Sequence, residues 1–401
     1  MKTTRWKMGG ALAVALAASA CGDDLISAER EQFLAVCGEN QRPGTACTWL
    51  GVPGQDGFTP DGAHRLDTMV SMSMDILFHS SGEVWFHDWN NHLVRRVLLD
   101  DTVETMVGWT DPIFPGDGVP GDPGAEKRPG GAPGVEVRLN HPTDFAEDAD
   151  GTVLLMAWHN HKLRRIDPET GTVTIDCGGG GGFAGDGGPA EQALFKQPNK
   201  LARAADGTLY ITDQQNQRVR RIAPDGVIST VAGNGTAGFA GDGGPATEAM
   251  IACEIGSNPA PTCGVAVDGE RLYISDTLNH RIRVVDLETG IIDTLAGDGE
   301  PGYAGDGGAA AAARFSYPQD LEIGPDGDLY IADTNNSVIR AIDLDSGTVR
   351  TVAGTGELGL GEEGLPARQT ALRRPWGVEF DPDGNLYIMD SLNHRIVKVL
   401  R

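Results

Sequence analysis

Leu386-Tyr-Ile-Met-Asp390-Ser-Leu-Asn-His-Arg-Ile-Val397 decides the fold, because nearly the same stretch occurs again as Leu272-Tyr-Ile-Ser-Asp276-Thr-Leu-Asn-His-Arg-Ile-Arg283. Each copy consists of a short apolar run that ends in aspartate, a polar turn, and a second run that begins with arginine. Short runs rich in aromatic and β-branched residues, bounded by turn residues, predict paired β-strands. The repetition therefore predicts a protein built from copies of one β unit.

The unit occurs six times, and two of its copies are degenerate. The first strand of each copy ends at Asp88, Ala157, Asp213, Asp276, Asp333 and Asp390. These positions are separated by 69, 56, 63, 57 and 57 residues. The two longest intervals contain extra segments, a Gly/Pro-rich stretch over 121–134 and the stretch from Cys253 to Cys263. A β unit of about 57 residues that is repeated radially predicts a β-propeller.

Each unit divides into four strands. In the fifth unit the expected strands are 321–323, 329–331, 338–342 and 348–352, separated by Asp-Gly and Ser-Gly turns that favour hairpins. No stretch beyond the first twenty residues shows a sustained helical period of apolar residues. We therefore expect an all-β domain over 45–401, a six-bladed propeller of four-stranded antiparallel blades.

The last unit lacks a fourth strand, because the sequence stops directly after its third. A matching strand is found near the beginning, at Thr45–Gly51, where it leads into a Gly-Phe-Thr-Pro-Asp-Gly stretch. We predict that this N-terminal strand completes the last blade. That arrangement closes the ring and removes two exposed strand edges.

The first twenty residues resemble a bacterial signal peptide. A positively charged start precedes an apolar run over 9–20 that is too short for a permanent membrane helix. The sequence Ala18-Ser-Ala-Cys21 resembles a lipobox, with alanine in place of the more usual leucine. We expect a signal peptide over 1–20, a lipidated Cys21, and a tether over 21–44 with a small disulfide loop. An ordinary cleavage site beside an incidental cysteine is the alternative.

The charge of the chain limits its partners. The formal net charge is −25, and it becomes −28 when the leader takes three basic residues away. A surface this acidic repels phosphate backbones, so we expect no nucleic acid partner. We expect a monomer in the cell envelope of a bacterium that faces the periplasm or the exterior and touches the membrane only through its lipid anchor.

The remaining cysteines fit an oxidising compartment. Cys37 and Cys47 enclose nine residues, as do Cys253 and Cys263, so local pairing is the simplest prediction. Each such loop would stabilise the fold by roughly 3 kcal/mol in the chain-entropy description. Cys177 has no nearby partner in the sequence, and we expect a buried thiol.

The candidate site lies at the start of the first strand of each unit. A position that is glycine in two units (Gly264 and Gly377) is charged in the other four, and this innermost strand would direct these side chains toward the central channel. With their neighbours, the candidate ligand-binding residues are Asp75, Asp144, Lys200, Asp320, Asn199, Gln319 and Trp376. Asp75, Asp144 and Asp320 could coordinate a hard cation such as Ca²⁺. Alternatively, Asp144 or Asp320 pairs with Lys200.

The units resemble NHL repeats of bacterial, teneurin-type propellers. The likeness covers 46–401 and includes the Gly-Asp-Gly-Gly loops at 182–190, 238–246 and 302–310. It implies a propeller that acts as a binding scaffold or, less often, as a metal-dependent enzyme. Amidating lyases of this group hold metal with several channel histidines, whereas here only His141 lies in the corresponding region.

The recurring motifs have simpler structural roles. The Gly-Asp-Gly loops lack the spacing of a calcium loop and would connect neighbouring blades. The Asn-His-Arg triplets at 279–281 and 393–395 would stabilise blades, because they recur at one place per unit. We therefore expect a recognition scaffold for a protein or glycan. A metal-dependent hydrolase or lyase acting in the channel is the alternative, and a purely structural envelope protein is a third.

Overall fold

A computed structural model describes residues 22–38, 41–108, 130–256 and 260–401 of the chain. Two compact units are present, over Met1–Gln41 and Arg42–Arg401. The first unit contains helix α1 (Gly22–Cys37), where the sequence had predicted only a tether. The helix has a local cause, because the run Glu31-Gln-Phe-Leu-Ala35 consists mostly of strong helix formers. No helix of the described residues is long and apolar enough to cross a membrane.

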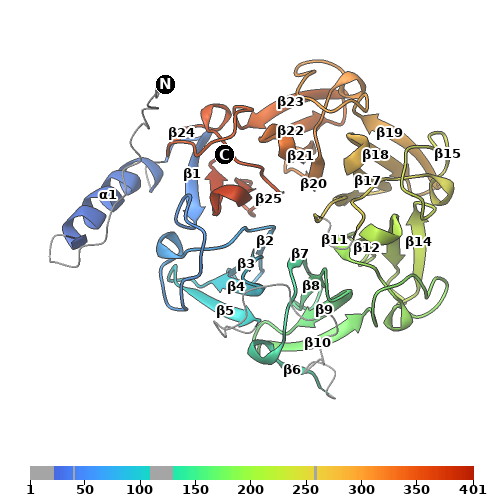
Figure 1. The fold of residues 1–401 in the computed structure, drawn as a ribbon, viewed down its shortest axis with the longest axis horizontal. Helices are drawn as coiled ribbons and strands as arrows, with labels where there is room; N and C mark the ends of the chain where they lie inside the picture. The colour runs from blue at the N-terminus through green and yellow to red at the C-terminus, as the bar shows by residue number, and fades with distance from the viewer. Residues whose placement is uncertain (1–21, 39–40, 109–129, 257–259) are drawn as a thin grey trace, which may run out of the picture. The chain divides into compact units, whose positions relative to one another are not determined.

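The second unit is the expected propeller, with six sheets arranged around a centre (Figure 1). Strands a to d run outward from the centre in each blade. Blade 1 consists of β2 (Ile76–Phe78), β3 (Val84–Asp88), β4 (Leu93–Val97) and β5 (Val103–Val107). Blade 2 consists of β7 (Pro142–Glu147), β8 (Val153–Ala157), β9 (Lys162–Ile166) and β10 (Thr172–Cys177). Blade 3 consists of β11 (Pro198–Arg203), β12 (Leu209–Asp213), β13 (Arg218–Ile222) and β14 (Ile228–Ala232).

The second half of the ring repeats the pattern. Blade 4 consists of β16 (Val265–Asp268), β17 (Arg271–Asp276), β18 (Arg281–Asp286) and β19 (Ile291–Ala296). Blade 5 consists of β20 (Pro318–Ile323), β21 (Leu329–Asp333), β22 (Val338–Asp343) and β23 (Thr348–Ala353). Blade 6 consists of β25 (Gly377–Phe380), β26 (Leu386–Asp390), β27 (Arg395–Val399) and β1 (Thr45–Leu50). All six anchor positions predicted from the sequence end strand b.

The N-terminal strand closes the ring as predicted. β1 pairs antiparallel with β27, with Ala46 opposite Val399 and Thr48 opposite Val397. Figure 1 shows this blue strand on the outer side of the red strands of blade 6. The connecting loops add a short fifth strand to the outer edge of three blades: β6 (Ala132–Pro133), β15 (Gly244–Pro245) and β24 (Leu365–Pro366). Each loop thus belongs to the blade that follows it.

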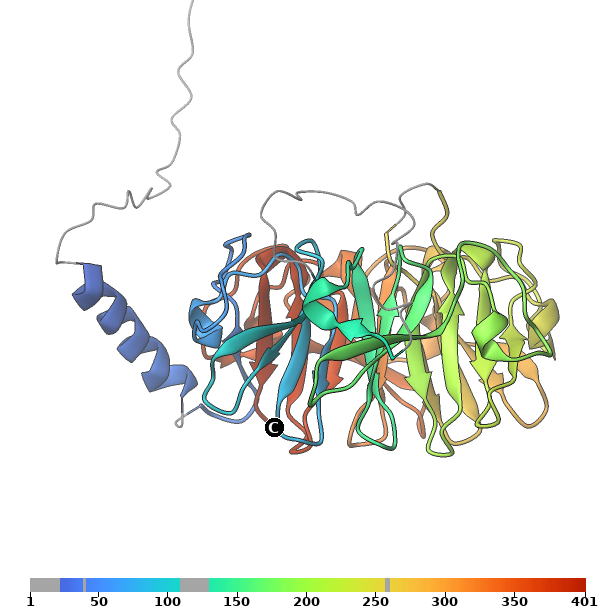
Figure 2. The same ribbon diagram turned by 90° about the horizontal axis from the view of Figure 1, so that it is seen from below.

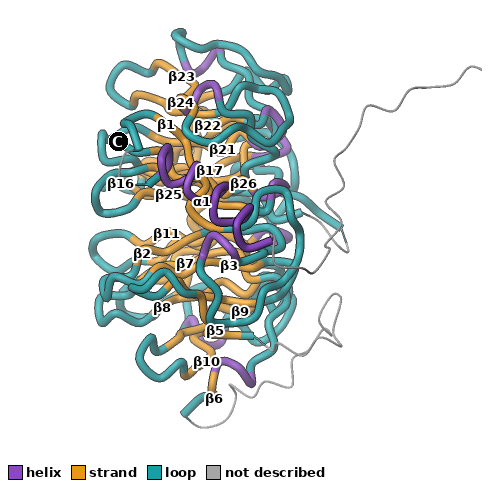
Figure 3. Tube along the Cα trace, turned by 90° about the vertical axis from the view of Figure 1, so that its left-hand side faces the viewer, coloured by secondary structure: helices purple, strands orange, loops and turns teal. Residues whose placement is uncertain are grey.

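The hydrophobic core lies between the blades. One cluster joins Tyr330 and Ile339 of blade 5 to Val378 and Ile388 of blade 6, and each of the five other pairs of adjacent blades has a comparable cluster. Seen edge-on, the strands run between two faces on which loops and turns gather (Figures 2 and 3). The two ends of the central channel therefore open among loops, on opposite faces.

A second ring of contacts is made of buried arginines on strand c, which we call the arginine ring. Its members are Arg95, Arg164, Arg220, Arg283, Arg340 and Arg395, each at most 1% exposed. In blade 4, Arg283 contacts Asp276 at the end of strand b and Asp242 in the connecting loop. Asn279 donates to Asp276 (2.7 Å) and to the Gly238 carbonyl of that loop (2.8 Å).

This arrangement explains both recurring motifs. The loop aspartate ties the connecting loop to the blade, and Asp242 also accepts a hydrogen bond from Thr294 on strand d (2.7 Å). His280 of the Asn-His-Arg triplet has a left-handed backbone (φ 55°) that ends the b–c turn. The structural roles expected for the triplets and loops agree with these contacts. The partner of the loop aspartate was not predicted.

Cys253 and Cys263 form the predicted disulfide, and both are fully buried. Cys37 and Cys47 each also take part in a disulfide. Cys177 is a buried free thiol, as expected, and burial raises its pKa. Cys21 lies outside the described residues, as does most of the Gly/Pro-rich stretch over 121–134.

Candidate functional site

The four charged residues predicted at the start of strand a meet in the centre of the propeller. Lys200 of β11 points its Nζ at Asp320 of β20 (2.9 Å) and Asp144 of β7 (3.0 Å), with Asp75 just before β2 at 4.0 Å. All four residues are at most 5% exposed. We call them, with the two glycines at the equivalent positions, the channel ring. One ammonium group thus stands among three carboxylates, in the position where a coordinated cation would lie.

Each aspartate of the channel ring also joins two blades. The Oδ2 atom of Asp75 accepts from the backbone N–H of Phe145 in blade 2 (3.1 Å), and that of Asp320 accepts from Val378 in blade 6 (3.0 Å). Asp144 accepts in the same way from Leu201 in blade 3. Hydrogen bonds to a carboxylate are stronger than neutral ones. These aspartates therefore hold neighbouring strands a together besides holding Lys200.

The two glycines of the ring allow close approach where no charged group stands. A Cβ atom on Gly264 would lie 2.2 Å from the carbonyl oxygen of Gln319, and one on Gly377 would lie 2.4 Å from that of Met74. Contacts this short would force the inner strands apart. Aspartate thus joins blades through its side chain, whereas glycine lets the backbones meet directly.

The channel ring holds more acid than base. Burial lowers the pKa of Lys200, but the carboxylates of Asp144, Asp320 and Asp75 outweigh it and leave that pKa well above its ordinary value. Burial raises the pKa of Asp144 and of Asp320, against the opposing effect of Lys200. Lys200 therefore stays charged, and Asp144 and Asp320 retain protons at a pH where exposed aspartates have lost them.

Two glutamates beyond the ring were missed by the sequence analysis. Glu322 and Glu379 line a cavity of about 180 Å³ that extends from the channel ring away from the start of strand a. Burial, with the charges of Asp320 and Asp75, raises the pKa of Glu322 to about 8. Burial and the charge of Glu322 raise the pKa of Glu379. The signal was present, because both lie two residues after a ring position and alternate residues of a strand share a face.

The other end of the channel, where strands a begin, has aromatic side chains, and we call it the mouth. Trp89 follows β3 and packs on His141 (ring centroids 4.2 Å apart) and on Trp376 before β25 (5.7 Å, planes at 77°). Trp158 stacks on His159 (3.8 Å) and donates from its Nε1 to Gln214 (3.2 Å). Only Trp376 of this group was predicted, since the other tryptophans lie in the degenerate copies.

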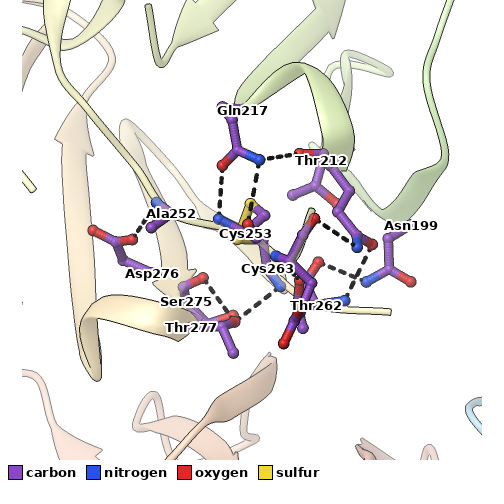
Figure 4. Close-up of a disulfide and its surroundings, with 12 residues drawn as sticks. Asn199, Thr212, Gln217, Ala252, Cys253, Thr262, Cys263, Ser275, Asp276 and Thr277 are labelled. Atoms are coloured by element: carbon purple, nitrogen blue, oxygen red, sulfur yellow. Dashed lines mark hydrogen bonds between the residues drawn. A yellow bond between two sulfur atoms is a disulfide. The ribbon is translucent and has the colours of Figure 1, made fainter. Parts of the chain in front are cut away.

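The predicted amides Asn199 and Gln319 also lie at the mouth and are 3% and 4% exposed. Asn199 donates from its Nδ2 to the carbonyl of Thr262, which closes the loop clamped by the Cys253–Cys263 disulfide (2.9 Å; Figure 4). The backbone carbonyl of Gln319 accepts from the Ser275 hydroxyl of the preceding blade (2.8 Å). The disulfide loop replaces the short turn that precedes strand a in the other blades and thereby helps to orient Asn199.

His141 lies beside two further histidines that the sequence did not indicate as its neighbours. Its ring lies beside those of His92 (4.3 Å) and His159 (5.0 Å), and burial together with these two neighbours lowers its pKa to about 2. Among the described residues, the mouth histidines form no group of three converging ligand atoms with one another or with carboxylates. This packing is therefore unlike a zinc site, which needs three or four protein ligands.

Comparison with known proteins identifies the repeats. The NHL repeat family model matches residues 315–341 and 372–399, in blades 5 and 6. Protein SUPPRESSOR OF QUENCHING 1, chloroplastic, of Arabidopsis thaliana is 30% identical over 273 residues, which cover 65% of this chain and 25% of that protein. Human teneurin-1 is 27% identical over 225 residues, which cover 51% and 7%. The chain thus spans a minor part of these relatives.

The fold likeness extends further than the sequence likeness. The crystal structure of an auxiliary nutrient binding protein from Bacteroides ovatus matches with a TM-score of 0.61 at 16% identity, covering 88% of this chain and 76% of that one. This match concerns the fold alone. The expected NHL, teneurin-like resemblance is confirmed, and the blades of this chain include NHL repeats.

Proposed function

We propose that this propeller of NHL repeats is a lipid-anchored, extracytoplasmic recognition module that binds a protein or glycan at the mouth of its channel. One observation carries the proposal: Lys200 stands among Asp75, Asp144 and Asp320, so that an ion cluster occupies the centre of the channel. The cavity on one side of this cluster is lined by Glu322 and Glu379, whereas the mouth on the other side offers a partner aromatic and amide side chains. Ligand-binding sites are typically lined by aromatic side chains together with a small number of polar groups at fixed positions.

The alternative, a metal-dependent hydrolase or lyase, would need an open position for a cation among the channel residues. In the channel ring that position holds the Lys200 ammonium, and one carboxylate oxygen of each aspartate already accepts a hydrogen bond from a backbone N–H. A resident Ca²⁺ would have to displace a lysine whose pKa is raised by the same three carboxylates. The geometry supports recognition over metal chemistry.

The proposed location rests on separate features. The buried Cys253–Cys263 disulfide fits an oxidising compartment. The lipobox-like sequence at Cys21 supports anchoring at the membrane surface. With net charge −25, a monomeric and highly soluble module that avoids nucleic acid is consistent with this setting.

Metal analysis tests the choice between the two functions. The purified protein is compared with an Asp75/Asp144/Asp320→Asn variant by elemental analysis and by melting with and without added Ca²⁺. We expect neither preparation to contain stoichiometric divalent metal and neither to melt higher with Ca²⁺. Stoichiometric metal in the parent that is lost in the variant, together with turnover of ester or lactone substrates, would overturn the proposal in favour of the enzyme.

A further inference from the structure

We infer that the mouth binds a neutral saccharide, and this inference rests on the proposed function of the same site. It starts from two walls on opposite sides of the ring. Trp376 and Trp89 belong to blades 6 and 1, whereas Gln197 and Asn199 belong to blade 3. Figure 1 shows β25 and β11 across the centre from each other. The channel between them is narrow, since Lys200 of blade 3 reaches Asp320 of blade 5 (2.9 Å).

The aromatic wall is held rigidly but is not fully covered. Trp89 is fixed between His141 and Trp376, and both tryptophans keep part of their surface exposed. A packed tryptophan loses little conformational entropy on binding and offers a flat apolar face. The C–H face of a sugar ring matches such a surface.

The polar atoms around the mouth are incompletely satisfied. Among the described residues, the Nε1 atoms of Trp89 and Trp376, the Oε1 of Gln197 and the Oδ1 of Asn199 have no hydrogen-bond partner. Gln197 and Asn199 are only 7% and 3% exposed. Buried polar atoms without partners are rare and costly in a finished protein. Two donors on one wall and two acceptors on the other fit a ligand that both donates and accepts.

The orientation of Asn199 is set by its surroundings. The Thr262 carbonyl can only accept, so the amide must turn its Nδ2 toward it, and Figure 4 shows the Oδ1 atom on the opposite side. The disulfide loop that supplies Thr262 is itself held, because Thr262 receives a hydrogen bond from the backbone N–H of Glu254 (2.9 Å) and Cys263 donates to Thr277 (3.0 Å). Asn199 thus presents a fixed acceptor.

These features together select the ligand class. Hydroxyl groups donate and accept at once, which matches both walls. None of the four unpaired groups carries a charge that could pair with a charged ligand. The net charge of −25 also repels anions. A neutral saccharide offers both the apolar ring face and the hydroxyl rim.

The experiment observes the mouth directly. The protein is labelled with 5-fluorotryptophan, the six of its seven tryptophans that follow the leader are assigned by single Trp→Phe variants, and ¹⁹F spectra are recorded during titration. The probes are hexamers of glucose, mannose, xylose and N-acetylglucosamine, with an oligogalacturonate as anionic control. We expect at least one neutral hexamer to shift the Trp89 and Trp376 signals at up to about 10 mM, a range that detects millimolar affinity.

Variants separate recognition from folding. We expect Trp376→Ala to weaken that binding at least about tenfold, and Asn199→Ala to weaken it about threefold, with calorimetry as the readout. Trp376→Phe keeps the aromatic face and should lose less than Trp376→Ala, even if both variants melt lower. Trp49, which packs on Tyr387 and Arg65 away from the mouth, provides the matched control as Trp49→Phe.

The outcomes distinguish this inference from the proposed function. If no hexamer shifts the two signals, or if binding survives Trp376→Ala, the saccharide inference is wrong. A deglycosylated envelope-protein fraction that then shifts the same signals would leave the recognition function standing with a protein partner. If neither the hexamers nor that fraction shifts them, both proposals fail.

Discussion

The arginine ring and the channel ring are both circles of buried charge, but they use the six blades differently. In the arginine ring every blade contributes an arginine at the same position of strand c. Five of these arginines pair with a buried carboxylate of their own blade, as Arg220 pairs with Asp213 and Arg340 with Asp333. In the channel ring the equivalent positions hold three aspartates, one lysine and two glycines. Identical residues satisfy a need that every blade shares. Different residues indicate a property of the assembled ring.

The two rings also differ in charge balance. Five of the arginines face a strand-b aspartate and a loop carboxylate, as Arg283 faces Asp276 and Asp242, whereas strand b of blade 2 ends at Ala157 and Arg164 donates to Asn160. The channel concentrates three aspartates on one lysine, with Glu322 and Glu379 nearby. Substitution of Lys200 alone therefore leaves several buried carboxylates without their cation. Substitution of one arginine in the arginine ring affects the charges of a single blade.

Lys200→Ala should have the largest effect on stability. It leaves three buried carboxylates without their cation, and removal of one partner of a buried ion pair costs about 3–5 kcal/mol. We expect a free energy of unfolding lower by at least that amount in denaturant titrations. Because the vacated position is surrounded by Asp75, Asp144 and Asp320, millimolar Ca²⁺ should restore part of the loss in this variant alone.

A matched control removes the charges together. Lys200→Met combined with asparagine at the three aspartate positions keeps an oxygen for the N–H groups of Phe145, Leu201 and Val378. Neutral replacement of a whole buried cluster is often close to neutral in stability. This variant should therefore recover most of the free energy lost by Lys200→Ala. If both variants are equally unstable, packing of the lysine stem and not its charge accounts for the effect.

Arg283→Met should have a smaller and repeatable effect. It leaves Asp276 buried without its cation, but Asn279 and the backbone N–H of Ala252 still donate to that carboxylate (2.7 Å each). We expect a loss of about 3 kcal/mol, and a smaller loss for Arg283→Lys, which keeps the charge but not the fork that reaches two aspartates.

The same substitution in another blade checks the repetition. Arg220→Met should cost the same as Arg283→Met within about 1 kcal/mol, because in both blades the arginine pairs with the strand-b aspartate and with the loop aspartate. Neither substitution should alter saccharide binding at the mouth. A difference of several kcal/mol between the two would contradict the view that the arginine ring is a purely repeated device.

The sequence predicted what repeats and missed what depends on closure. The spacing of the six anchor positions predicted the six blades, and the strand-like run at Thr45–Leu50 predicted the contact that closes the ring. Both predictions succeeded because the patterns are encoded locally in the sequence. The position of Lys200 could be placed in the channel. Its pairing with Asp144 or Asp320 was one of the predicted alternatives, whereas its reach to all three aspartates depends on the radius of the closed ring, which no local pattern contains.

The mouth was predicted only in part for a similar reason. Trp376 stood in a regular copy of the repeat, but Trp89 and Trp158 replace ordinary turn residues in the degenerate copies. The contact of Trp89 with Trp376 joins the first blade to the last. Helix α1 was missed because the apolar residues among its 16 positions show only a weak helical period, although its helix-forming composition was visible.

The smallest predicted effect is a dependence of stability on pH that originates beside the channel ring. The folded pKa of Glu322 is about 8, above its ordinary value of 4.5, with Asp320, Asp75, Lys200 and Glu379 as the neighbouring charged groups. A carboxyl whose folded pKa is raised stabilises the fold at low pH, and this contribution is lost as pH rises through the folded pKa. The melting temperature should therefore fall between about pH 5 and pH 9. Glu322→Gln, which stays neutral throughout, should reduce that fall by about 2–4 °C.

Glu288→Gln, at an exposed turn of blade 4, is the matched control and should leave the slope unchanged. An unchanged slope in Glu322→Gln would mean that the glutamate is already ionised in the folded protein, and that the excess of acid in the channel is balanced by solvent and not by retained protons.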